Sequence, residues 1–294
     1  MDYIIYKVFV SFGKAIALLP MRGLYILSDL LYPIVYYIIK YRRKVVYENL
    51  RNSFPEKSNK EIEQIAKKFY RYFCDLLFET IKLLHIPPDE LVRRFKFRDT
   101  SQILKEFEHK KHILAVLGHY GNWEWGLSLG LQIPYNFVGI YKPLTNKYFD
   151  ELMIRLRTQY GCEAVPMRQT ARALNTYIQQ GRLTILNFIT DQSPYSSDIQ
   201  YWTTFLNQDT PVLLGVEKFA KKTRQPVYYL SIIRVRRGYY EIEFEKLCDD
   251  CSTLENHELT EIHVKALEKL IRSAPEYWLW THRRWKNKRE QHTP

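Results

Sequence analysis

The chain runs Ile113-Leu-Ala-Val-Leu-Gly-His-Tyr-Gly-Asn-Trp-Glu124 at its most informative point. Five apolar residues bounded by a glycine are typical of a short buried strand. His119 follows directly after this strand. Open α/β sheets bind their ligands at the carboxyl ends of their strands. We therefore predict that a strand at residues 113–117 delivers His119 to a binding loop.

His119 and Glu124 are five positions apart, with Glu124 expected on the first turn of the following helix. A carboxylate that holds one imidazole nitrogen as N–H leaves the other nitrogen free to accept a proton. The simpler interpretation is a structural pair. Gly118 and Gly121 favour the catalytic one, because they indicate a tight turn with exposed backbone N–H groups. Zinc is less well supported, since the spacing lacks two histidines one helical turn apart.

The chain after residue 100 alternates between strand and helix patterns. Strands are predicted at residues 113–117, 135–141, 184–189, 227–234 and 239–244, and helices at 145–160, 168–180, 212–223 and 258–273. This alternation predicts an α/β fold, with a mostly parallel central sheet flanked by helices. The last two strands are expected to form a hairpin through residues 236–238.

Residues 41–100 are expected to be mainly helical. Ser58 and Glu61 have the spacing of a capping box at a helix start. Apolar residues then recur at helical spacing, which predicts core packing. Glu79 lies within this helix, and we interpret it as structural rather than as an acid or base.

The first 41 residues are strongly apolar and predict a hydrophobic helical, membrane-associated segment. A membrane-spanning helix needs about 20 apolar residues. Residues 23–39 approach that length but contain Asp29 and Pro33. One or two helices in the membrane interface, or one marginal span, fit this pattern; a helical cap packed on the core is the alternative. No cleaved signal peptide is expected. Basic residues at 40–44 would lie at headgroup level on the cytoplasmic side.

The composition favours anionic partners. The 294-residue chain has a net charge of +12 and contains 23 tyrosines. Basic and aromatic residues together suit a membrane interface. They also suit single-stranded nucleic acid, but no RNA-binding signature or helix-turn-helix pattern is present, so no nucleic acid partner is expected. The four cysteines do not suggest a disulfide scaffold, which is consistent with a reduced, cytoplasm-facing protein.

The His-x4-Glu motif after an apolar strand resembles the first motif of the glycerolipid-type acyltransferases. The wider chain resembles the bacterial lipid A biosynthesis (lauroyl/myristoyl-type) acyltransferases, in the lysophospholipid acyltransferase-like superfamily. The similarity covers about residues 15–288. The further matching stretches are residues 41–55, Arg157-x3-Gly161, residues 185–192 and residues 275–286.

This resemblance implies a membrane-bound O-acyltransferase. His119 would be the general base and Glu124 its orienter. Backbone N–H groups near Gly121 and Asn122, together with Arg157, would stabilise the oxyanion. The resemblance also places two further residues beside His119, namely Asp191 and Gln192.

The expected donor is an acyl-carrier protein or acyl-CoA thioester, and the expected acceptor is a hydroxyl of a lipid A precursor or related glycolipid. No cofactor and no metal are expected. The resemblance implies the cytoplasmic face of the bacterial inner membrane, with peripheral or single-span attachment. The alternatives are an aminolipid or glycerophospholipid acceptor, or a non-catalytic protein that binds anionic membranes.

The expected organisation is a membrane-associated segment at residues 1–41, an acyltransferase α/β domain at 42–288 and a polar tail at 289–294. Near the C-terminus, residues 278–286 combine tryptophans with basic residues. Two interpretations stand open for them: an interfacial belt or phosphate clamp, or packed tryptophans with solvated arginines.

Overall fold

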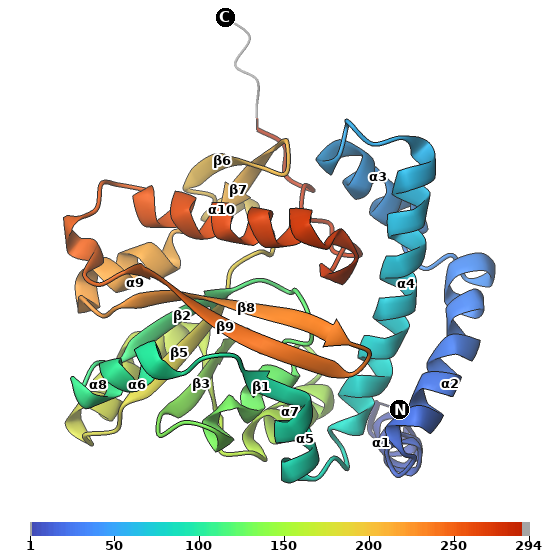
Figure 1. Ribbon diagram of the computed structural model, residues 1–294, viewed down its shortest axis with the longest axis horizontal. Coiled ribbons are helices and arrows are strands. Elements are labelled where there is room, and N and C mark those ends of the chain that lie inside the picture. The colour runs from blue at the N-terminus through green and yellow to red at the C-terminus, as the bar shows by residue number, and fades with distance from the viewer. Residues whose placement is uncertain (1, 290–294) are drawn as a thin grey trace, which may run out of the picture.

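The computed structural model describes residues 2–289 and has a central sheet flanked by helices (Figure 1). The seven strands of this sheet are ordered β1-β9-β8-β2-β5-β3-β4. Their bounds are β1 (Phe95–Phe97), β2 (Ile113–Leu117), β3 (Asn136–Tyr141), β4 (Glu163–Pro166), β5 (Thr184–Ile189), β8 (Val227–Arg236) and β9 (Tyr239–Cys248). All neighbouring pairs are parallel except β8–β9, which confirms the predicted mostly parallel α/β fold and the final hairpin.

The predicted strands and helices after residue 100 all occur, with small differences at their ends. The features that were not predicted include the helix α6 (Ser101–Glu108), the strands β1 and β4, and a separate antiparallel pair formed by β6 (Tyr201–Phe205) and β7 (Gln208–Val212). The strands β1 and β4 have three and four residues, too few for a periodic pattern. The sequence of β7 contains polar residues and a proline, which are uncommon inside strands and so gave no strand prediction.

The helices cover both faces and one end of the sheet. They are α1 (Asp2–Ala17), α2 (Met21–Pro33), α3 (Arg43–Ser53), α4 (Asn59–Lys82), α5 (Pro88–Arg94), α6 (Ser101–Glu108), α7 (Lys147–Thr158), α8 (Thr170–Gln179), α9 (Gly215–Thr223) and α10 (Glu258–Ser273). A π-helical turn, η1 (Ile34–Ile38), continues α2, and a 3-10 helix, η2 (Trp125–Leu131), follows the His119 loop. The predicted capping box starts α4, where the Glu61 N–H donates to Ser58 Oγ at 3.3 Å.

The N-terminal helices α1 and α2 pack against α4 at one end of the sheet (Figure 1), and α2 also bonds to the turn between β8 and β9 through Arg237. Among the described helices, none alone is long and apolar enough to cross a membrane. One pair of helical segments, Met21–Ile38 and Arg43–Ser53, is long and apolar enough when taken together, but the two are bent by 86° relative to each other. The inner face of α2 is buried, whereas its outer face exposes Ile26 and Leu30, followed by the exposed Ile34 at the start of η1. The segment therefore caps the core on one side and presents an apolar surface on the other.

The domain boundaries given above remain predictions. Residues 290–294 of the predicted polar tail lie outside the described residues. Residues 2–41 are continuous in packing with the rest of the fold, because Leu24 and Met21 belong to the same core as the sheet residues Ile113 and Ala115.

Candidate active site

His119 lies at the carboxyl end of β2, as predicted from the apolar run. All five residues of β2 are buried between β5 and β8. A Cβ at Gly118 would lie 3.1 Å from Asp191 Oδ2 and 2.7 Å from Leu267 Cδ1. Gly121 has φ +63°, and a Cβ there would lie 2.5 Å from the Ile232 carbonyl oxygen. Both glycines therefore permit a close approach of the loop to its surroundings.

The imidazole of His119 is paired with Asp191. The His119 Nδ1 to Asp191 Oδ1 distance is 2.6 Å, and the backbone N–H of His119 donates to Asp191 Oδ2 at 2.8 Å. Trp278 Nε1 donates to the same Oδ2 at 2.7 Å. The pairing follows from the sheet, because β5 lies directly beside β2 and Asp191 comes two residues after β5.

Asp191 is an ionised, buried carboxylate. Burial by itself would raise its pKa, but the charge and hydrogen bonds of His119, with that of Trp278, lower the pKa to about 2. A carboxylate in this position accepts a hydrogen bond from the Nδ1–H of the imidazole. The other nitrogen, Nε2, is then the one that can accept a proton. The imidazole is mostly buried, with 15% of its surface exposed.

Two residues surround the imidazole on its outer side. Gln192 Nε2 lies 3.3 Å from His119 Nε2, and the Trp123 ring meets the imidazole edge-on with centroids 5.0 Å apart. Asp191 and Gln192, which the family resemblance placed near His119, thus both contact its ring, one at each nitrogen.

Glu124 does not pair with His119. Its carboxylate accepts from Arg157 of α7, with Nη2–Oε1 at 2.9 Å and Nε–Oε2 at 3.3 Å. The prediction that Glu124 orients His119 is therefore wrong in this structure. The expected helix turn at Glu124 is instead a loop that turns at Gly121 and enters η2 only at Trp125, so Glu124 faces α7. Arg157, expected at the oxyanion, is held by this ion pair.

The backbone donors of the loop are partly used. The Gly121 N–H donates to the Tyr277 carbonyl at 3.1 Å, so it is not free to bind an oxyanion, contrary to the prediction. The Asn122 side chain is fully buried. It donates to Glu79 Oε2 at 2.7 Å and accepts from the Trp125 N–H at 3.1 Å. Within residues 2–289, no protein acceptor takes the Asn122 backbone N–H.

The C-terminal segment is a wall of the site rather than a surface belt. Trp278, Trp280 and Trp285 are buried, which confirms that the tryptophans pack. Arg284 is also buried, so it is not solvated. His282 Nε2 accepts from the Ser193 N–H at 3.1 Å, and burial lowers the pKa of His282 to about 4. The Trp278 bond to Asp191 could not be predicted, because 87 residues separate the two.

Comparison with known proteins identifies the family of this chain. The family model for bacterial lipid A biosynthesis acyltransferases matches residues 1–287. The chain is similar to the lipid A biosynthesis lauroyltransferase of Escherichia coli (strain K12), with 26% identity covering 91% of this chain and 90% of that protein. It is also similar to the lipid A biosynthesis palmitoleoyltransferase of the same strain, with 24% identity covering 85% and 80% of the two chains.

A lipid A biosynthesis acyltransferase of Shigella flexneri shows 24% identity over 254 residues. These relatives match over most of their own lengths, and the family model spans nearly the whole chain, including the His119 loop and the Asp191 segment. The chain therefore belongs to the bacterial lipid A biosynthesis acyltransferase family and is an acyltransferase.

Proposed function

We propose that this protein transfers a fatty acyl chain from an acyl thioester to a hydroxyl of a lipid A precursor, with His119 as the general base. The observation that carries the proposal is the His119–Asp191 pair at the carboxyl end of β2, with Nδ1 held by the carboxylate at 2.6 Å. This arrangement is suited to activating a hydroxyl, because it leaves Nε2 as the nitrogen without a proton, next to Gln192 at 3.3 Å. The names of the relatives support the choice of acceptor.

The reaction is a direct transfer. Nε2 of His119 takes the proton of the acceptor hydroxyl while its oxygen attacks the thioester carbonyl carbon. The resulting tetrahedral oxyanion collapses, the C–S bond breaks, and the thiolate receives the proton from the imidazolium. Asp191 stabilises the imidazolium throughout. Gln192 lies close enough to Nε2 to contact the acceptor hydroxyl.

Oxyanion stabilisation is assigned to the Asn122 backbone N–H and to Arg157. Glu124 acts at one remove by holding the Arg157 guanidinium through two hydrogen bonds. Burial would lower the pKa of Arg157, but the charge of Glu124 raises it, so the guanidinium stays positive. A fixed positive charge beside a developing oxyanion stabilises the transition state, and removing one oxyanion-hole donor from a serine protease costs about 2.7–4 kcal/mol.

The proposed location is the cytoplasmic face of the bacterial inner membrane. The outer surface of α1, α2 and η1 exposes large apolar side chains, including Phe12, Leu30 and Ile38. Basic residues border it, among them Lys14 and Arg42. Such a surface suits helices that lie in the interface of an anionic membrane. The acyl donor bound by this basic protein would be an acidic acyl-carrier protein or acyl-CoA. No metal or cofactor takes part in the proposed steps.

The test is mass spectrometry of membrane lipids from a strain that lacks this protein, complemented with variants. We expect one secondary acyl chain to be missing from lipid A. Wild type and His109→Ala, which alters an exposed histidine, should restore it, and His119→Ala should not. Complementation by His119→Ala would show that the base is wrong. Unchanged lipid A with an altered aminolipid or phospholipid would show that the acceptor is wrong, and unchanged lipids throughout would favour a non-catalytic protein.

A further inference from the structure

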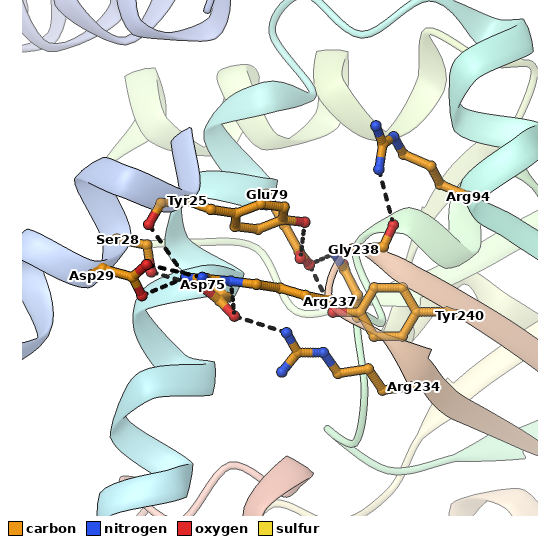
Figure 2. Close-up of polar contacts among 11 residues, drawn as sticks. Tyr25, Ser28, Asp29, Asp75, Glu79, Arg94, Arg234, Arg237, Gly238 and Tyr240 are labelled. Atoms are coloured by element: carbon orange, nitrogen blue, oxygen red, sulfur yellow. Dashed lines mark hydrogen bonds and ion pairs between the residues drawn. The ribbon is translucent and has the colours of Figure 1, made fainter. Parts of the chain in front are cut away.

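A buried polar network lies beneath the catalytic loop, between α2, α4 and the β8–β9 hairpin (Figure 2). Asp75 and Glu79 are one turn apart on the same face of α4 and are both buried. Asp75 accepts from Ser28 of α2 at 2.7 Å and from Arg234 and Arg237 of the hairpin at 2.8 and 2.6 Å. The two guanidinium groups compensate the charge of Asp75, so this half of the network fastens α2 to the hairpin.

Glu79 is the centre of the other half. It is fully buried and accepts three side-chain hydrogen bonds. Tyr25 of α2 donates to Oε1 at 2.9 Å, while Asn122 Nδ2 and the Tyr240 hydroxyl both donate to Oε2 at 2.7 Å. Three donors converge on this position, and a glutamate suits it because an ionised carboxylate accepts hydrogen bonds and donates none. Leaving such donors buried without a partner would cost about 1–3 kcal/mol for each group.

Asn122 connects this carboxylate to the catalytic loop. It lies three residues after His119, and its Oδ1 accepts the Trp125 N–H that begins η2. The indole of Trp125 in turn donates to the Glu79 backbone carbonyl at 3.1 Å. One residue of α4 therefore holds both ends of the segment from Asn122 to Trp125, while Asp191 holds His119 itself.

We propose that Glu79 is a positioning residue for acyl transfer. Through Asn122 it fixes the loop that carries His119, and through Tyr25 it joins that loop to α2, the helix with the exposed apolar face. The inference rests on the proposed role of His119. A displacement of about 1 Å at a reacting group can lower a rate by about a hundredfold. Loss of the Glu79 contact to the loop should therefore lower kcat before it weakens substrate binding.

The structure offers a matched control, because Asn122 and Tyr240 donate to the same oxygen at the same distance. Glu79→Leu should lower kcat by about tenfold to a hundredfold, with KM for thioester and acceptor little changed. Glu79→Gln should restore most of kcat, since its carbonyl accepts from Asn122 and Tyr240 and its amide donates to the Tyr25 hydroxyl. Tyr240→Phe removes an equally buried bond but not the loop contact, so it should lower Tm and leave kcat near wild type.

A second readout does not depend on turnover. Carbethoxylation of His119 by diethyl pyrocarbonate, followed by peptide mass spectrometry, should change severalfold in rate in Glu79→Leu and not in Tyr240→Phe. If Glu79→Leu does not fold, Glu79→Asp carries the test, because the shorter carboxylate withdraws from Asn122 and should lower kcat in the same sense.

Wild-type kcat and a wild-type His119 reaction rate in the folded variant, with only Tm reduced, would overturn the proposal and leave Glu79 a structural residue. Failure of the proposed function is distinguishable. Wild-type protein inactive on the lipid A precursor would refute the assigned acceptor, whereas the carbethoxylation rates would still report whether Glu79 positions the loop.

Discussion

His119 is held by a carboxylate that lies 72 residues further along the chain, and this contact decides which ring nitrogen accepts a proton. Asp191 is fixed by three hydrogen bonds, two from His119 and one from Trp278. Its orientation is therefore set before any substrate binds. A base prepared in this way needs little reorganisation during the reaction.

Exchanging Asp191 for Asn tests this contact. The amide of Asp191→Asn can donate to Nδ1, which would place the imidazole proton on Nε2 and prevent it from acting as the base. We expect kcat to fall by about a hundredfold or more, measured as acyl transfer by purified protein. Glu124→Gln is the comparison variant, since it can retain a hydrogen bond to Arg157 and should cost less. A large loss in Glu124→Gln with none in Asp191→Asn would restore Glu124 as the orienter.

At the scale of elements, the turn between β2 and η2 requires glycine at position 121 for two separate reasons, a positive φ and a close approach of its backbone to β8. Gly121 and Gly161 both have positive φ, at +63° and +81°. A Cβ at Gly121 would also meet the Ile232 carbonyl at 2.5 Å, whereas one at Gly161 would have no atom within 4 Å. The two positions therefore separate backbone strain from close approach to β8.

Gly161→Ala should destabilise the protein by about 1–2 kcal/mol from backbone strain alone. Gly121→Ala should cost more, on the order of 4 kcal/mol, because strand β8 or the loop must also move. Urea unfolding of the two variants measures the difference. Equal losses would show that the loop can shift away from Ile232 without cost.

At the scale of the whole molecule, the exposed apolar face of the N-terminal helices should bind membranes. Ile26 and Leu30 are 62% and 63% exposed on the outer face of α2. Burying one such side chain contributes about 1.5–3 kcal/mol. The double variant Ile26→Asn, Leu30→Asn should therefore bind anionic vesicles at least about tenfold more weakly.

Vesicle co-sedimentation is the measurement, and Ile178→Asn is the control, because Ile178 is 50% exposed but lies on α8. The same loss of binding in Ile178→Asn would contradict the assignment of the face. Binding by wild type should also weaken at high salt, since the basic residues near the helices act through a screened field.

Acid stability is a second property of the whole molecule. Burial lowers the pKa of His263 to about 4, an effect that the charge of Glu217 partly offsets, from an ordinary value of 6.5. Above pH 6.5 the side chain is neutral in both states. As the pH falls from 6.5 to 4 the unfolded chain takes up a proton that the folded chain does not, so folding stability decreases.

The expected decrease from His263 is about 3 kcal/mol over this range. His263→Leu should unfold in urea with a smaller loss of stability between pH 6.5 and 4 than wild type. His282, whose pKa burial also lowers to about 4, leaves a residual decrease in the variant. His109→Ala, at an exposed position, should follow wild type; an unchanged slope in His263→Leu would mean that His263 is protonated equally in both states.

Local patterns were enough to predict the α/β fold, the buried strand before His119, the β8–β9 hairpin and the capping box at Ser58, because each depends on residues within a few positions of one another. Short strands such as β1 gave no such signal. Glu124 was the nearest carboxylate in sequence but not in space, because β5 lies beside β2 and brings Asp191 to the imidazole. The uses of the Gly121 N–H, Arg284 and Glu79 likewise depend on partners more than 40 residues away, since packing between distant elements decides them.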